Sequence, residues 1–376
     1  MKRVRFSEGR QYNSEKDQMP LSTCTLMPLF LKQFLASFII YLALCSFSAS
    51  AQNQAVILQY HHVSTETPPI TSISPEDFER HINYLQVNDF HVLPLETVIS
   101  NLRNGISLPD KTAVITFDDG YTSVYETAFP RLKAIGWPFT VFVTSGLVGS
   151  NERLYATWNQ IREMAINGAT IANHTISHPY LLERDESMNQ DEWLAQVELE
   201  IIGAEKTITE ETGQNHKLLA YPYGEYNNAI KSLVQNLGFS GIAQHSGPIN
   251  ATSDFLALPR FPLSGIYASM NTFPAKMMSL AFNVEDLIPN SPTTTSKSPE
   301  AILNFSNDQA GLGQIACFNN NEMITPVLED AEENQYRIST HIENNSRRFR
   351  YNCTAPAGSG RYYWYSIPWI NPGIAE

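Results

Sequence analysis

Residues 113–120 read AVITFDDG, in which a short apolar run is followed at once by two carboxylates and a glycine. The run predicts a buried β-strand that ends at Asp118 and Asp119. In α/β folds, ligands collect at the C-terminal ends of strands, and two adjacent carboxylates there repel each other unless a positive charge lies beside them. A metal ion would supply that charge, whereas a plain Asp-Asp-Gly turn is the alternative interpretation.

Around this strand, short apolar segments alternate with amphipathic helices from residue 55 to about residue 281. This pattern is typical of a parallel α/β sheet or barrel. Ser74 is placed to cap one helix, with Pro75 at its first position, and Gly238 is placed to end another. The expected helices carry apolar stripes within residues 78–85, 125–132 and 230–237. The expected strands cover residues 56–60, 113–117, 139–143, 170–173, 218–221 and 241–244.

Two further strand ends carry polar motifs. Residues 173–178 read NHTISH, so His174 and His178 stand four residues apart and can converge on one ion. Two imidazoles and one carboxylate leave positions open for water and substrate, as a catalytic metal requires. Residues 220–224 read AYPYG, where proline and glycine restrict the loop and the backbone N–H of Tyr223 can serve as an oxyanion-hole donor. Each motif alone also suits an ordinary turn, but the three motifs together indicate a catalytic site.

The order and spacing of the three motifs resemble the polysaccharide deacetylase family, also called the NodB-homology or carbohydrate esterase family 4 domain, over about residues 54–285. The resemblance implies a deformed (β/α) barrel that hydrolyses acetylated glycans with the help of a divalent metal ion. It assigns Asp119, His174 and His178 as metal ligands and Asp118 as the general base. This donor set is expected to hold zinc, with nickel or cobalt as alternatives.

At two functional positions the sequence departs from the commonest family pattern. The usual acid histidine lies near the end of the domain, where His245 is the one candidate. His61, directly after the first strand, instead resembles the circularly permuted order of the poly-N-acetylglucosamine deacetylases, so we predict His61, and not His62, as the general acid. The alternative is that one of the two histidines caps a strand and the other lies at the surface. Ala220 stands where many relatives carry an arginine that orients the base. We predict that Arg260 supplies this charge from another strand, the alternative being a surface arginine.

The composition of the sequence changes near residue 288, where Pro, Ser and Thr become frequent. Residues 288–299 read IPNSPTTTSKSP and predict a linker between a deacetylase domain at residues 52–287 and a second domain at residues 300–376. The second domain is expected to be a small all-β, sandwich-like unit stapled by a disulfide between Cys317 and Cys353. Its aromatic run at residues 362–365 is interpreted as core in preference to a sugar-stacking platform.

The N-terminus is interpreted as a signal peptide at residues 1–51, in which an apolar run precedes a small-residue cleavage site. The charged stretch before that run is long, so translation would begin at Met19 or Met27. Cys45 suggests a lipoprotein site, but the bulky Leu44 beside it argues against lipid anchoring. We therefore expect a periplasmic or secreted protein without a stable transmembrane span.

Composition narrows the function further. The formal net charge is −13 and the content of charged residues is 17%, which argues against nucleic acid as a partner. The predicted function is hydrolytic, metal-dependent N-deacetylation of N-acetylglucosamine units in a polysaccharide, with release of acetate. The alternatives are an O-acetyl polysaccharide esterase and a non-catalytic glycan-binding protein on the same scaffold.

Overall fold

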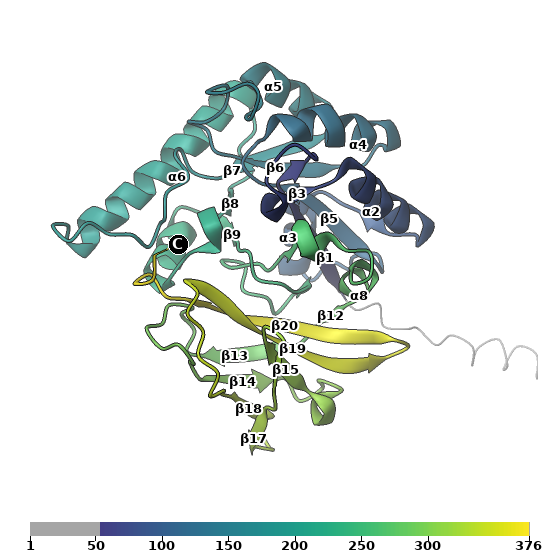
Figure 1. Cartoon of the computed structure of the whole chain (residues 1–376), viewed down its shortest axis with the longest axis vertical. Coiled ribbons are helices and arrows are strands. Elements are labelled where there is room, and N and C mark those ends of the chain that lie inside the picture. Colours follow the sequence, from purple (N-terminus) through teal and green to yellow (C-terminus); the bar gives the residue numbers. More distant parts are fainter. Residues whose placement is uncertain (1–52, 376) are drawn as a thin grey trace, which may run out of the picture. The chain divides into compact units, whose positions relative to one another are not determined.

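The computed structural model describes residues 53–375, all of which belong to one compact unit. Its largest sheet has nine strands in the order β10-β1-β5-β6-β7-β8-β9, with β11 beside β1 and β4 beside β5 (Figure 1). Neighbouring strands pair in parallel, apart from β1 with β10. The strands are β1 (Gln54–Tyr60), β4 (His91–Val92), β5 (Thr112–Phe117), β6 (Phe139–Val143), β7 (Ala169–Asn173), β8 (Leu218–Ala220), β9 (Ser240–Ile242), β10 (Ile249–Asn250) and β11 (Phe261–Pro262). The predicted α/β class is confirmed.

Helices cover the outside of this sheet, as Figure 1 shows for α2, α4, α5 and α6. The cap of α2 is the predicted one, since the Ser74 hydroxyl accepts a hydrogen bond from the Asp77 N–H at 3.0 Å and Pro75 takes the first position. Gly238, with a φ of 79°, follows the end of α7. The α-helices are α2 (Pro75–Val87), α3 (Leu95–Arg103), α4 (Phe129–Ile135), α5 (Trp158–Ile166), α6 (Gln190–Thr212), α7 (Asn228–Asn236) and α8 (Phe273–Met277).

The helix expected at residues 125–132 has two parts. Val124–Ala128 (η2) is a π-helical turn, and α4 continues from it. Pro130 has no N–H to donate to the carbonyl four residues earlier, and its ring would clash with that carbonyl in a regular α-helix. The wider π turn accommodates the proline, a feature that apolar periodicity does not predict.

Residues 258–262 connect the two ends of the parallel strand series. Leu258 bridges in parallel to Ile242 at the end of β9. Three residues further on, β11 begins and pairs in parallel with Leu58 and Gln59 of β1. The sheet is thereby curled toward closure, in agreement with the predicted deformed (β/α) barrel, and Arg260 lies in the connecting segment.

Two smaller sheets contain the C-terminal strands, as expected for an all-β region. Their orders are β12-β20-β19-β15-β16 and β13-β14-β18-β17. Apolar side chains of both sheets form one core that includes Leu303, Tyr351 and Trp369. The strands are β12 (Leu280–Ala281), β13 (Val284–Ile288), β14 (Ala301–Phe305), β15 (Ala316–Asn319), β16 (Glu322–Ile324), β17 (Val327–Asp330), β18 (Gln335–Ile338), β19 (Arg348–Gly358) and β20 (Arg361–Ile370).

A disulfide joins the middle of this core. Cys317 of β15 and Cys353 of β19 stand directly opposite each other and are bonded, as predicted. Of the aromatic run interpreted as core, Tyr363 is buried, whereas Tyr362 is exposed. Trp364 packs edge-on against Phe261 of the large sheet, with ring centroids 5.2 Å apart.

The C-terminal sheets begin earlier in the chain than the sequence indicates. Both β12 and β13 pair with strands of these sheets, although they lie in the segment expected to end the deacetylase domain. Within the expected linker, Thr293 bridges to Ile370 of β20. Residues 280–299 are therefore tied to the C-terminal sheets by backbone pairing.

Among residues 53–375, no helix combines the length and the apolar character needed to cross a membrane. The predicted signal peptide, with Met19, Met27 and Cys45, lies outside the described residues.

Candidate active site

The Asp-Asp motif lies at the C-terminal end of β5, inside the large sheet. The backbone turns sharply there, because Asp119 and Gly120 have φ values of 69° and 73°. Glycine adopts this conformation without steric cost, and aspartate is among the few other residue types that tolerate it. Strands β6, β7 and β8 run parallel to β5. Their C-terminal ends therefore open at the same edge, which gathers the three sequence motifs in one place.

Asp119, His174 and His178 meet at this edge. Oδ1 of Asp119 lies 3.3 Å from Nε2 of His174 and 3.4 Å from Nε2 of His178. One ligand atom from each residue falls within 4.8 Å of the other two. The loop after β7 folds back to allow this, with the His178 N–H donating to the hydroxyl of Thr175 at 3.1 Å. The structure thus brings all three predicted ligands together.

The hydrogen bonds of His174 test whether this cluster fits a metal ion. Its Nδ1 lies 2.8 Å from the carbonyl oxygen of Ala220, and because a carbonyl can only accept, Nδ1 carries the proton. Burial lowers the pKa of His174, but the neighbouring Asp119 and Asp118 outweigh burial and raise it above its ordinary value. When the ring gives up the proton on Nε2, that buried nitrogen carries a lone pair that faces the Asp119 carboxylate. Two electron-pair donors at this distance fit a shared cation, so the residues present suit a divalent metal.

The charge states of the cluster agree with that role. Burial raises the pKa of Asp119, but the hydrogen bond and charge of His174 and the charges of His61 and His178 outweigh burial and lower it below its usual range. Burial, with the neighbouring His174, lowers the pKa of His178 to about 4. At neutral pH, Asp119 is therefore an anion and His178 a neutral imidazole, the forms in which these side chains bind metals.

Asp118, the predicted base, is fully buried beside the cluster and is held on both oxygens. Arg260, also fully buried, donates Nη1 to Oδ1 at 2.7 Å and Nη2 to Oδ2 at 2.8 Å. Gln59 of β1 donates its amide to Oδ2 at 2.7 Å. The guanidinium is itself fixed, since its Nε donates to the carbonyl of Ala243 at 2.9 Å. The structure therefore places Arg260 against the base, where the alternative of a surface arginine does not hold.

These contacts decide the charge of Asp118. Burial works to raise its pKa, because an ion loses hydration in the interior. The charge of Arg260 works the other way, with contributions from His174 and His61, and the pKa of Asp118 is lowered from its ordinary value. The carboxylate is therefore ionised at neutral pH, as a proton acceptor must be.

His61 follows β1, which pairs with β5 as the permuted order requires. Its Nε2 lies 3.8 Å from Oδ2 of Asp118, and its side chain is 18% exposed. By contrast, burial together with the charge of Arg350 lowers the pKa of the half-buried His245 to about 3. A histidine that stays neutral at neutral pH is a poor proton donor, so the geometry favours His61. His62 is buried and its ring centroid lies 3.5 Å from that of Tyr121, so it is not a surface histidine.

Tyr223 lies in the short 3-10 turn Pro222–Gly224 (η3), directly after β8. Its backbone is left-handed, with φ 57° and ψ 5°. The ring stands edge-on to His178 at 4.4 Å and stacks on Tyr180 at 4.0 Å. A Cβ atom on Gly224 would meet the Cβ of Gln244 at 2.7 Å, so this turn requires glycine. The predicted oxyanion loop therefore adjoins the candidate metal site.

Two residues of the site were missed at the sequence level. Gln59 is a polar residue in the fully buried strand β1, and that contrast with its apolar neighbours is a signal that could have found it. Glu225 follows the Tyr223 turn and is fully buried against Arg347. Its sequence context resembles an ordinary surface turn and gives no such signal.

Comparison with known proteins agrees with this geometry. Residues 105–242 match the family described as polysaccharide deacetylase. The poly-beta-1,6-N-acetyl-D-glucosamine N-deacetylase of Staphylococcus aureus (strain MRSA252) is 25% identical over 233 residues, covering 57% of this chain and 80% of that protein. The enzyme of the same name from Escherichia coli (strain K12) is 22% identical over 292 residues, covering 68% of this chain and 41% of that protein. The solved structure of IcaB from Ammonifex degensii has a TM-score of 0.51 at 26% identity, covering 59% of this chain and 94% of its own.

The chain therefore contains a polysaccharide deacetylase domain. The large sheet, with its polar residues at the C-terminal ends of the strands, has the architecture of this class of protein. The similarity to the two named poly-beta-1,6-N-acetyl-D-glucosamine N-deacetylases and to IcaB confirms the predicted resemblance to the poly-N-acetylglucosamine type. The E. coli relative is much longer than the region it shares with this chain.

Proposed function

We propose that this protein is a metal-dependent N-deacetylase acting on N-acetylglucosamine units of a polysaccharide. The observation that carries the proposal is the buried, arginine-held carboxylate of Asp118 beside the cluster of Asp119, His174 and His178. The names of the relatives support the substrate class. The reaction consumes one water and one acetamido group and yields acetate and a free amine.

Within this proposal, Asp119, His174 and His178 hold the metal. A divalent ion bound there, zinc before nickel or cobalt, would lower the pKa of water and polarise the acetyl carbonyl. Asp118 accepts the proton of the attacking water, because it is ionised and lies next to the ligand cluster. Its orientation is fixed by Arg260 and Gln59, so no side-chain rotation is needed when the proton arrives.

Two further groups complete the reaction. The backbone N–H of Tyr223 donates to the acetyl oxygen as negative charge develops on it. His61 protonates the departing nitrogen, which would otherwise leave as an unfavourable amide anion. Its partial exposure and its position beside the base support this role, since it can meet a bound glycan from the open side of the site.

The cellular setting is part of the same proposal. The protein is exported to the periplasm or the medium after removal of residues 1–51, without lipid anchoring at Cys45. The disulfide between Cys317 and Cys353 supports an oxidising compartment. The boundary between the deacetylase domain and the β domain lies before β12, because residues 280–299 pair with the C-terminal sheets.

The test is acetate release from a panel of glycans by metal-stripped protein that is reloaded with zinc, nickel or cobalt. Poly-β-1,6-N-acetylglucosamine, chitin oligomers and peptidoglycan report N-deacetylation, and acetylated xylan reports O-deacetylation. Metal-dependent release from an N-acetylated glycan supports the proposal. Release from xylan alone would assign an O-acetyl esterase, and glycan binding without any release would assign a binding protein.

A further inference from the structure

Glu225 is a fully buried carboxylate that directly follows the Tyr223 turn. Arg347 donates Nε to one oxygen at 2.6 Å and Nη2 to the other at 2.8 Å. Arg348, the first residue of β19, adds a third hydrogen bond at 2.8 Å. Burial of an ionised carboxylate is costly without such partners, and loss of one partner is strongly destabilising. The Tyr223 turn is therefore tied to the C-terminal sheets through a buried charge.

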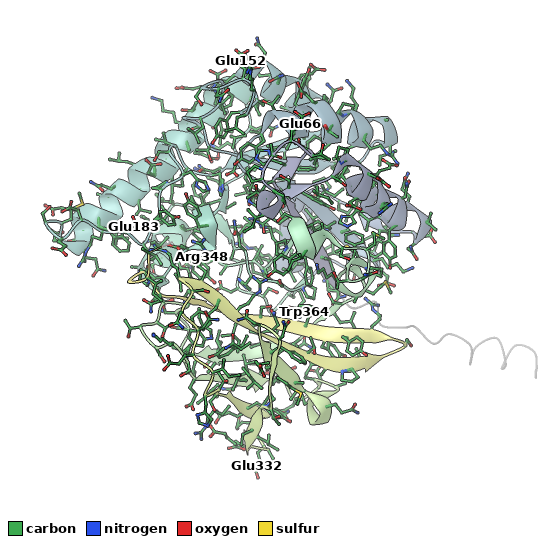
Figure 2. The ribbon with its side chains drawn as sticks, viewed as in Figure 1. Glu66, Glu152, Glu183, Glu332, Arg348 and Trp364 are labelled. Carbon is green, nitrogen blue, oxygen red and sulfur yellow. A yellow bond between two sulfur atoms is a disulfide. The ribbon has the colours of Figure 1, made fainter. Side chains whose placement is uncertain are left out.

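The same two arginines also cover the aromatic rings around the turn. The guanidinium carbon of Arg347 lies 4.7 Å from the ring centre of Tyr180, and that of Arg348 lies 5.3 Å from the ring centre of Tyr223. Tyr180 stacks on Tyr223, whose ring meets His178. Figure 2 shows Arg348 where the C-terminal strands approach the large sheet. Contacts thus run without a break from Arg347 to a candidate metal ligand.

The turn itself needs external support. A left-handed backbone at a non-glycine residue such as Tyr223 is strained and persists where the surroundings hold it. Arg347 is a rigid support, because its Nη1 also donates to the carbonyls of Pro372 and Ile374 at 3.2 Å each and lies 3.4 Å from the carboxylate of Glu183. A guanidinium held on several sides cannot follow a moving loop.

We propose that Arg347, assisted by Arg348, is a positioning residue that holds the Tyr223 turn in its active geometry through Glu225. The C-terminal sheets are then part of the active-site architecture. Arg347 contacts no reacting atom and acts through the backbone that carries the oxyanion donor. The catalytic consequence rests on the proposed function, whereas the mechanical link does not.

The direct test is hydrogen exchange in the full-length, metal-loaded protein. The amides of Gly224 and Glu225 donate to the carbonyls of Tyr221 and Pro222 within the turn, so their exchange reports its opening. In Arg347→Met these amides should exchange at least 10-fold faster than in the wild type, while those of β5 and β6 keep their rates. Arg348→Met, whose side chain is 28% exposed, should fold readily and show a smaller increase at the same amides.

Kinetics supply the second readout. If the turn positions an oxyanion donor, Arg347→Met should lower kcat for acetate release about 10-fold while KM changes less than 3-fold, because the N–H acts mainly in the transition state. Metal content should stay at the wild-type level. Arg337→Met is the matched control, since Arg337 belongs to the same sheets but pairs with Glu300, and it should leave both readouts unchanged.

The outcomes separate the two proposals. Unchanged exchange in the turn of Arg347→Met overturns the positioning role, as does faster exchange that is equal throughout the chain. If Arg347→Met does not fold, unchanged turn exchange and kcat in Arg348→Met overturn it. A wild type that releases no acetate refutes the proposed function, while the exchange result still decides the link between Arg347 and the turn.

Discussion

Arg260 and Arg347 each grip a buried carboxylate with two hydrogen bonds, but the carboxylates have different tasks. Arg260 holds Asp118, the proposed base, whereas Arg347 holds Glu225, which follows the loop that carries the oxyanion donor. Both pairs join segments more than 100 residues apart. The same interaction thus controls the charge of a reacting group in one region and the shape of the backbone in the other. Substitutions in the first region should change the pH dependence, and those in the second should change loop motion.

The metal cluster lies beside both carboxylate regions, and substitutions of its ligands should give the largest effects. Asp119→Ala, His174→Ala or His178→Ala should each abolish metal binding and acetate release, because each removes one of three protein ligands. Elemental analysis of the purified variants measures occupancy. Full occupancy in any of them would remove that residue from the ligand set.

Asp118→Asn should separate the base from the ligands. The amide cannot accept the proton, so turnover should fall about 10²-fold or more while the metal stays bound. Steady-state rates and metal content measured on one preparation check this. A rate near that of the wild type would mean that the carboxylate held by Arg260 is not the base. Arg260 and Arg347 would then no longer have the different roles assigned to them above.

His61→Ala probes the acid on the other side of the same carboxylate. Amide hydrolysis should fall about 10²-fold, since the nitrogen must be protonated as it leaves, while an aryl acetate should be hydrolysed at nearly the wild-type rate because its leaving group needs little protonation. His245→Ala is the control and should affect both substrates alike. If the His245 variant alone lost amide hydrolysis, the general acid would be His245 and not His61.

Arg260→Met should change the rate less than the variants of the ligands, the base and the acid, and it should give the most diagnostic change in pH profile. Without the guanidinium, burial of Asp118 is uncompensated and its pKa rises, so the base is protonated at higher pH than in the wild type. The acidic limb of kcat/KM should therefore move to higher pH, with a loss of about 10-fold or more near neutrality. Arg260→Lys keeps the charge and should move the limb less.

Arg347→Met tests the second arginine in the same way as Arg260→Met tests the first. It should lower kcat without moving the acidic limb, because Glu225 takes no part in proton transfer. A shift of the limb in this variant equal to that in Arg260→Met would show that the two arginines act in the same way.

The sequence predicted the part of the site that lies on strand ends. Asp118, Asp119, His174 and His178 sit in short motifs after apolar runs, and parallel pairing brings such ends together whatever the details of the loops. Arg260 was also within reach of the sequence. Ala220 stands where many relatives carry the arginine that orients the base, so the base Asp118 needed a positive partner from elsewhere. Arg260, next to another strand, was the replacement that we predicted.

The remaining features depend on contacts that no local pattern encodes. Arg347 and Arg348 form a basic pair in a polar stretch, which in sequence looks like a solvated surface, and their carboxylate partner lies more than 120 residues earlier. The strand β13 was assigned to the preceding domain because four of its five residues precede the Pro/Ser/Thr segment that predicted the boundary, although its backbone pairs with β14. The π turn before α4 arises from one proline inside a regular apolar stripe.

The central claim is that this site hydrolyses amide-linked acetyl groups with the help of a metal. The most direct measurement is to incubate metal-stripped protein with poly-β-1,6-N-acetylglucosamine, add one equivalent of zinc, and count released acetate and newly formed primary amines together. The account predicts no reaction before zinc and equal amounts of acetate and amine after it, with the reaction lost in Asp118→Asn that binds zinc normally. Acetate without new amines, or the same rate in the zinc-loaded Asp118→Asn variant, would contradict it.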